Sequence, residues 1–139
     1  MMSGIRGKNT RPEVAVRKLL FASGYRFRLH RKDLPGAPDI VLPSRRIAIF
    51  VHGCFWHMHG GCKSAKLPKT RSAFWVAKLS GNVARDLHAV TALNELGWRV
   101  LTVWECSIRG RSSAESLLPE LVNWIEGLQP IGEISMVES

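Results

Sequence analysis

Residues 47–62 read Ile-Ala-Ile-Phe-Val-His-Gly-Cys-Phe-Trp-His-Met-His-Gly-Gly-Cys and join an apolar run to a cluster of reactive side chains. The run is rich in β-branched and aromatic residues, which predicts a strand. The cluster holds two of the chain's three cysteines, three of its five histidines and an adjacent Phe-Trp pair. We therefore expect the chemistry of the protein to lie at the carboxyl end of this strand.

The segments around this strand indicate a mixed α/β fold. Residues 39–43 and 46–51 are expected to form a hairpin around the Pro-Ser-Arg turn at 43–45. Residues 25–29 alternate apolar with basic side chains, as in a strand with one buried face. Residues 98–104 are nearly continuous in apolar and β-prone types and predict a further, central strand.

Helical patterns separate these strands. A Thr-x-x-Glu pattern ending at Glu13, with a proline in the first turn, predicts a helix over 11–22. Apolar spacing predicts helices over 71–79 and 82–96, parted by Ser-Gly, with their apolar residues in the core. A helical crossover into the next strand favours a parallel neighbour for that strand.

The end of the chain is less clearly patterned. A last helix is predicted over 112–127, or from near Ser116 with Pro119 in its first turn. Beyond Leu128 we expect a weakly patterned, mobile tail over about 128–139. The length of 139 residues fits a single domain, 1–139, with its core at about 10–126.

Charge is the first clue to function. Twenty Lys and Arg residues against eleven Asp and Glu give a net charge of +9, which favours a polyanionic partner such as nucleic acid. The alternative is that the charge only aids solubility. No apolar run reaches the ~20 residues of a membrane span, and no basic amphipathic helix suggests membrane binding. The polar start lacks a signal-peptide pattern, so we expect a cytosolic protein.

Cysteine and histidine spacing predicts a zinc site. Cys54, His57, His59 and Cys62 are suitably spaced, and Cys106 is available from the end of the last strand. Three cysteines with one histidine would close a tetrahedral structural site. Only one of the two loop histidines is needed, which leaves the other, and His52, for chemistry. The alternative is that these are free thiols and surface histidines.

Other candidates have simple structural explanations. Asp39 enters its strand from a Pro/Gly loop, where a carboxylate is often a turn former. Glu13 is explained by the helix cap, and Phe55 and Trp56 by core packing. The residues alone leave these alternatives open.

Four motifs in order resemble the very-short-patch-repair (Vsr-type) DNA mismatch endonucleases. They are Met2-Ser-Gly-Ile-Arg-Gly-Lys-Asn-Thr-Arg-Pro-Glu13, Leu34-Pro-Gly-Ala-Pro-Asp39, Val51-His-Gly-Cys-Phe-Trp-His57 and Val103-Trp-Glu-Cys-Ser-Ile-Arg-Gly-Arg111. The resemblance covers about residues 2–124. It implies a restriction-endonuclease-like α/β fold, with a central mixed sheet flanked by helices and a structural zinc site. It also implies Mg²⁺-dependent nicking of one DNA strand at T:G mismatches left by deamination of 5-methylcytosine.

The resemblance also implies roles for residues at matching motif positions. Asp39 would bind Mg²⁺ with the backbone carbonyl of Val51, and Glu13 would lie in the outer metal shell. His57 would be the general base, with His52 close to the scissile phosphate. The zinc ligands would be Cys54, His59, Cys62 and Cys106. The residues wedged into the base stack would be Phe55 and Trp56, with Met2 assisting from the other groove.

Elementary chemistry agrees with these roles, because phosphodiester hydrolysis needs an activated water and a cation that absorbs charge on the phosphate. The implied partner is duplex DNA with a T:G mismatch, and other mismatch-repair proteins are further expected contacts. The enzyme would act as a monomer in the bacterial cytoplasm, at the nucleoid. Two alternatives remain: a zinc-stapled DNA-binding module without catalysis, and a related nuclease of restriction or defence.

Overall fold

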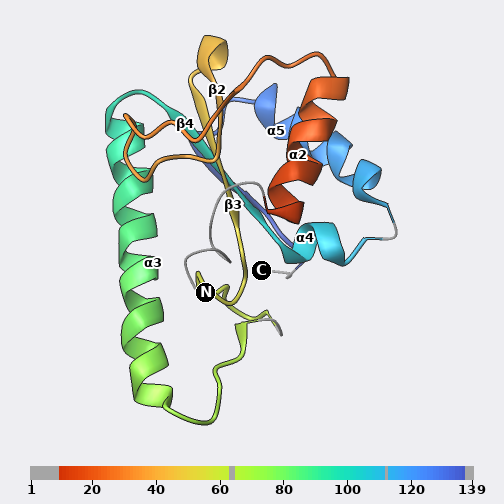
Figure 1. Ribbon diagram of the computed structural model, residues 1–139. Helices are drawn as coiled ribbons and strands as arrows, with labels where there is room; N and C mark the ends of the chain where they lie inside the picture. The colour runs from red at the N-terminus through yellow and green to blue at the C-terminus, as the bar shows by residue number, and fades with distance from the viewer. Residues whose placement is uncertain (1–9, 63–64, 112, 137–139) are drawn as a thin grey trace.

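The computed structural model describes residues 10–62, 65–111 and 113–136, and its centre is a five-stranded sheet (Figure 1). The strands are β1 (Arg28–Leu29), β2 (Ile40–Leu42), β3 (Ile47–His52), β4 (Arg99–Trp104) and β5 (Ile131–Ile134), in that spatial order. The pairs β1–β2 and β2–β3 are antiparallel, whereas β3–β4 and β4–β5 are parallel. The predicted hairpin and the predicted parallel neighbour of residues 98–104 are both confirmed.

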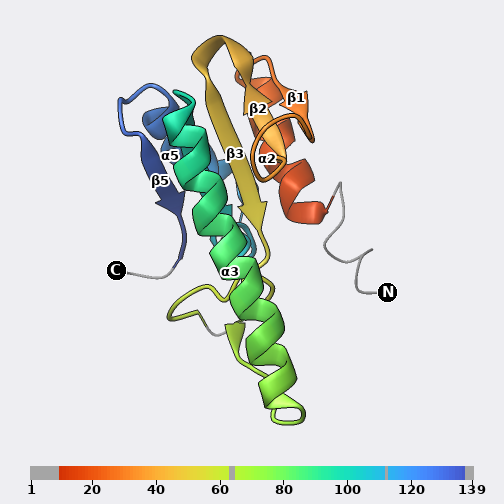
Figure 2. The ribbon, with the colours of Figure 1, turned by 90° about the vertical axis from the view of Figure 1, so that its left-hand side faces the viewer.

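Helices cover both faces of the sheet. The α-helices are α2 (Arg11–Ala22), α3 (Ser72–Glu95), α4 (Cys106–Arg109) and α5 (Leu118–Ile125), and short 3-10 turns are η1 (Pro43–Arg45) and η3 (Ala114–Leu117). Helix α3 lies on one face, while α2, α4 and α5 lie on the other (Figures 1 and 2). The predicted fold class, a mixed sheet flanked by helices, is confirmed.

The alternation of side chains along β3 decides which helix each residue meets. Ile47 and Ile49 pack in one core cluster with residues of α2 and α5, whereas Ala48 and Phe50 pack in a second cluster with α3. Successive strand residues point to opposite faces. His52 therefore lies on the α3 face of the sheet.

The predicted break between residues 79 and 82 is wrong, because α3 runs continuously for 24 residues. A glycine inside a helix costs only about 1 kcal/mol relative to alanine. Packing on either side outweighs that cost: Leu79 is fully buried, and the Asn82 amide donates to the carbonyl of Trp56 (2.8 Å). Although α3 is long, none of the helices in the described part of the chain is apolar enough to cross a membrane.

The two ends of the sheet also differ from expectation. The predicted strand over 25–29 is shorter, since only Arg28–Leu29 pair with β2. Residues 131–134 form a strand that the weak pattern after Leu128 did not predict, and pairing with β4 holds them in the sheet. The last α-helix begins at Leu118, with Pro119 in its first turn as one of the two alternatives predicted.

Candidate active site and metal centre

The carboxyl ends of β3 and β4 lie side by side because the two strands are parallel, with His52 paired to Trp104. The N–H of Glu105 donates to the carbonyl of His52 (2.9 Å) and joins the two strand ends. Cys54 follows β3 and Cys106 follows β4. This edge of the sheet is where most of the predicted site residues meet.

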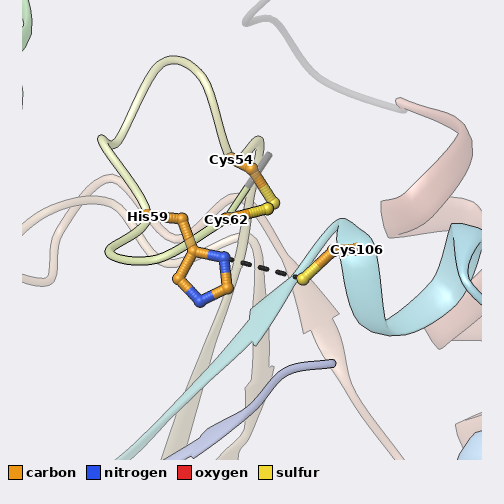
Figure 3. Close-up of side chains that lie close together, drawn as sticks. All are labelled: Cys54, His59, Cys62 and Cys106. Carbon is orange, nitrogen blue, oxygen red and sulfur yellow. Dashed lines mark hydrogen bonds between the residues drawn. The ribbon is translucent and has the colours of Figure 1, made fainter. Parts of the chain in front are cut away.

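Cys54, His59, Cys62 and Cys106, here called the thiol cluster, converge at this edge (Figure 3). Their ligand atoms all lie within 4.8 Å of one another, and the Nδ1 atom of His59 is 3.6 Å from the Sγ atom of Cys106. Ligands about 2.3 Å from a tetrahedral zinc ion lie about 3.8 Å apart, so the cluster is close to that geometry. His57 is not a member of this group. The cluster could therefore hold a metal ion without His57.

Two members of the thiol cluster, Cys54 and His59, are buried. Cys54 is fully buried, and burial raises the pKa of its thiol to about 12. A thiolate at this position needs a bound cation. The ring of His59 stacks on the indole of Trp104, with ring centroids 4.0 Å apart, which fixes the plane of the imidazole. Burial also lowers the pKa of His59 and favours its neutral, metal-binding form.

Glu13 and Asp39, here called the carboxylate pair, come from α2 and from the residue before β2. Glu13 comes from the buried face of α2 and is only 1% exposed, and its N–H is capped by the Thr10 hydroxyl (3.3 Å). Its carboxylate contacts His30, with Nε2 2.7 Å from Oε2. Asp39 precedes β2, and its Oδ2 atom accepts the N–H of Val51 (2.8 Å). The carboxylates of both residues and the imidazole of His30 lie within 4.8 Å of one another.

His52 and His57, here called the histidine pair, stack with ring centroids 3.7 Å apart and planes at 2°. Asp86 of α3 faces both rings: its Oδ2 atom is 2.6 Å from Nδ1 of His57, and its Oδ1 atom is 3.8 Å from Nε2 of His52. Burial lowers the pKa of His52 to about 3, so this imidazole is neutral. The short contact orients His57, the more exposed ring, as a carboxylate orients a general base.

One cavity of about 550 Å³ joins the carboxylate pair to the histidine pair. Its lining includes Glu13, Asp39, Val51, His52, Phe55, Trp56, His57 and Asp86. A phosphate group entering the cavity would meet carboxylates on one side and imidazoles on the other. That arrangement suits hydrolysis assisted by a cation and a base.

An aromatic cluster borders the same cavity. Phe55 and Trp56 pack edge to face, with ring centroids 5.1 Å apart. The ring centroid of Trp75 of α3 lies 5.4 Å from that of Phe55 and 6.1 Å from that of Trp56. All three side chains are half-buried. The expectation that the apolar residues of 71–79 belong to the core is wrong for Phe74, which is 45% exposed beneath the guanidinium of Arg71.

Sequence reasoning missed Asp86 and His30. Asp86 lies on a polar position of the helical pattern, and its place beside His57 depends on how α3 packs against the end of β3. His30 follows β1 directly, so correct pairing of β1 with β2 would have placed it next to Asp39. Met2 lies outside the described residues.

Burial raises the pKa of Asp39 from 3.8 to about 6. The folded protein binds the proton of Asp39 more tightly than the unfolded chain does. The stability gained from this proton is therefore fully present below pH 3.8 and is lost as pH rises through about 6. Asp39→Asn removes this ionisation. We expect the variant to exceed the wild type in free energy of unfolding at pH 7.5, by at most about 3 kcal/mol, with a smaller difference at pH 5.

Urea unfolding of zinc-loaded protein, in buffer without magnesium or chelator, measures this difference. An Asp39→Asn effect that is the same at both pH values would contradict the raised pKa. Asp33→Asn is the matched control, because Asp33 is 64% exposed and pairs with Arg31 on the surface.

Comparisons with known proteins agree with the geometry. A family model described as DNA mismatch endonuclease Vsr matches residues 1–63. The chain is 54% identical over 123 residues to the type II nicking enzyme V.XorIIP of Xanthomonas oryzae pv. oryzae, covering 88% of this chain and 90% of the relative. It is 45% identical over 128 residues to the DNA mismatch endonuclease Vsr of Escherichia coli K12, covering 91% and 81%. It is 40% identical over 126 residues to the type II nicking enzyme V.NmeAIP of Neisseria meningitidis serogroup A, covering 91% and 89%.

Proposed function

Because the chain belongs to the family of the DNA mismatch endonuclease Vsr and is therefore a DNA endonuclease, we propose that it nicks one strand of duplex DNA beside a T:G mismatch in a Mg²⁺-dependent reaction. The observation that carries the proposal is the cavity in which the carboxylate pair faces the histidine pair. The net charge of +9 supports binding to a polyanionic duplex.

The donor set fits a divalent cation. Asp39 is held by its Oδ2 atom, and its Oδ1 atom has no hydrogen-bond partner among the described residues. Oxygen ligands are those that Mg²⁺ prefers, so Asp39 would bind the ion with the carbonyl of Val51, and Glu13 would lie in the outer shell. When bound, the ion supplies positive charge to the phosphate as negative charge builds on it.

The histidine pair does the proton chemistry in this proposal. His57 takes a proton from the attacking water, and Asp86 keeps its ring in the required orientation. His52 is neutral because it is buried, so it faces the scissile phosphate as a neutral hydrogen-bonding group. The stacked rings fix the base relative to that phosphate.

The aromatic cluster supports recognition of a mismatch. Phe55 and Trp56 adjoin the cavity, and edge-to-face contacts with Trp75 hold them in place. Inserting an apolar side chain between stacked bases requires a few kcal/mol to unstack them, and this free energy is lowest at a mispaired step. We propose Phe55 and Trp56 as the wedge, with Met2 on the other groove.

Zinc in this proposal is structural. A zinc ion in the thiol cluster would link the loop after β3 to Cys106, which follows β4. It would thereby hold in place the loop that carries Phe55 and Trp56. Three thiolates and one imidazole occupy all four coordination positions of a tetrahedral zinc ion and leave none for substrate. Catalysis then belongs to a different ion, at Asp39.

The proposed role of Asp86 in orienting His57 can be tested by mutation. Asp86→Asn is expected to slow nicking about 10²- to 10⁴-fold, the usual contribution of a positioned general base, because the amide no longer stabilises the imidazolium of His57. Single-turnover nicking with saturating enzyme measures this rate, and affinity for the duplex should stay close to that of the wild type. Loss of DNA binding with an unchanged nicking rate would contradict the assignment. Asp33→Asn serves as the exposed control.

A panel of duplexes, labelled separately on each strand, tests the proposed function. It contains T:G, other mismatches and fully paired DNA, each with and without Mg²⁺. Nicking of only the thymine strand of T:G supports the proposal. Binding without cleavage of any duplex would favour a zinc-stapled DNA-binding module, and cleavage of both strands of paired DNA would favour a restriction or defence nuclease.

A further inference from the structure

The geometry points to His30 as a positioning residue of the divalent-cation site. We infer that its imidazole holds the carboxylate of Glu13 in the orientation in which the carboxylate pair receives the cation. The inference rests on the proposed function, because it takes the carboxylate pair as the site of that cation. It assigns a role to a histidine outside the histidine pair and the thiol cluster.

The register of the sheet places His30 beside Asp39. Leu29 pairs with Ile40 at the end of the β1–β2 ladder, and the N–H of His30 donates to the carbonyl of Asp39 (3.0 Å). The backbone of His30 is left-handed, with φ of 50°. Histidine, asparagine and aspartate tolerate this conformation better than most residues. The backbone therefore brings the imidazole to Asp39, and the side chain is left to interact with α2.

The side chain of His30 reaches the buried carboxylate of Glu13. Nε2 of His30 is 2.7 Å from Oε2 of Glu13, and Nη1 of Arg17 is 3.6 Å from the same oxygen. Asp39 is held in the same way, by one oxygen that accepts the N–H of Val51. One oxygen of each carboxylate is thus held by a named partner, His30 for Glu13 and the N–H of Val51 for Asp39.

The cavity distinguishes positioning from direct binding of the cation. Glu13 and Asp39 line the cavity, whereas His30 is not part of its lining and contacts Glu13 through Nε2. Partners that orient metal ligands in this way typically contribute 10- to 100-fold to metal affinity. Because the side chain of glutamate has several rotatable bonds, loss of His30 would let Glu13 turn away from the cation.

A matched pair of variants tests the inference. Glutamine places an amide nitrogen near the position of Nε2, whereas asparagine is too short to reach Glu13 but tolerates the left-handed backbone. Electron paramagnetic resonance of Mn²⁺, titrated into zinc-loaded protein without DNA, reports cation affinity. We expect His30→Asn to weaken Mn²⁺ binding 10- to 100-fold and His30→Gln to stay within about threefold of the wild type.

Three further variants complete the experiment. Asp39→Asn identifies which Mn²⁺ signal belongs to this site. His88→Asn is the matched control, since His88 is exposed on α3. In a Glu13→Gln background, His30→Asn should cause no further loss of Mn²⁺ affinity, because His30 acts through Glu13. Urea unfolding of each variant checks that the variant is folded under the conditions of the Mn²⁺ titration.

Nicking assays add a second readout. His30→Asn should raise the Mg²⁺ concentration needed for half-maximal nicking of T:G DNA by a similar factor, while the rate at saturating Mg²⁺ changes little. If the wild type does not nick T:G DNA but His30→Asn still weakens Mn²⁺ binding, the proposed function fails and the inference stands.

Several results would overturn the inference while T:G nicking persists. They are an unchanged Mn²⁺ affinity in His30→Asn, equal losses in His30→Asn and His30→Gln, and an additive loss in the Glu13→Gln background. Absence of Mn²⁺ binding by the wild type would also overturn it, because the inference assigns the cation to side chains of the protein itself.

Discussion

Asp39→Asn is expected to lower the rate of Mg²⁺-dependent nicking of T:G DNA by about 10³-fold or more, because a cation that stabilises phosphate charge is worth several kcal/mol. Asparagine keeps the shape of the side chain and its hydrogen bond from Val51 but loses the charge proposed to bind the cation. The fold should survive, since the buried carboxylate of the wild type is costly to ionise. The rate is measured under single-turnover conditions with saturating enzyme.

Two controls separate cation binding from other effects. Zinc content should be unchanged in Asp39→Asn, because Asp39 is not part of the thiol cluster. Affinity for the T:G duplex should be equal or higher, since the variant removes a negative charge facing phosphates. Nicking that persists at the wild-type rate would show that Asp39 is not the residue that binds the cation.

Cys54→Ser is expected to lower the free energy of unfolding by more than about 4 kcal/mol, a loss characteristic of removing a structural metal. Cys54 is fully buried, and a serine there would place a buried hydroxyl where a zinc ligand is needed. Because small domains are stable by only about 5–15 kcal/mol, much of the variant should be unfolded at 37 °C. Denaturant unfolding and the zinc content of the purified protein measure the two effects.

The loop histidines offer a matched pair for the same question. His59→Asn should lose most of the zinc and much of the stability, whereas His57→Asn should keep both, because only His59 lies in the thiol cluster. His88→Asn is the surface control. Purified wild-type protein with much less than one equivalent of zinc, or equal effects of His57→Asn and His59→Asn, would contradict a structural zinc site.

Local patterns predicted most of the elements near the site. The Thr-x-x-Glu cap begins a helix at Arg11 in the structure, and the apolar run of 47–51 lies within β3. These elements are governed by neighbouring residues, which a sequence displays directly. The break assigned near Gly81 was wrong because the tertiary contacts of Leu79 and Asn82 outweigh a local preference.

Long-range pairing accounts for the features that were missed. Residues 131–134 have only one buried side chain, Ile134, so their sequence shows little strand character and their order comes from β4. Asp86 and His30 acquire their partners from α3 packing on β3 and from the β1–β2 register. A single sequence gives no distance between such segments.

The crowded loop after β3 shows where residue types alone could not decide. Its spacing left both His57 and His59 open as zinc ligands, and the family resemblance implied His59. In the structure the chain turns tightly, with the N–H of His59 donating to the carbonyl of Cys54 (2.9 Å), and this turn directs His59 to Cys106. His57 faces Asp86 on the other side. Two neighbouring histidines thus serve separate sites.

Strand-specific nicking distinguishes a structural zinc ion from a separate catalytic magnesium ion. Zinc-loaded protein is mixed with a T:G duplex labelled on the thymine strand, and Mg²⁺ is then added without chelator. We expect no nicking before Mg²⁺ is added, rapid nicking of the thymine strand afterwards, and one zinc per protein throughout. Nicking by the zinc-loaded protein at the full rate without Mg²⁺, or no nicking after Mg²⁺ is added, would contradict this expectation.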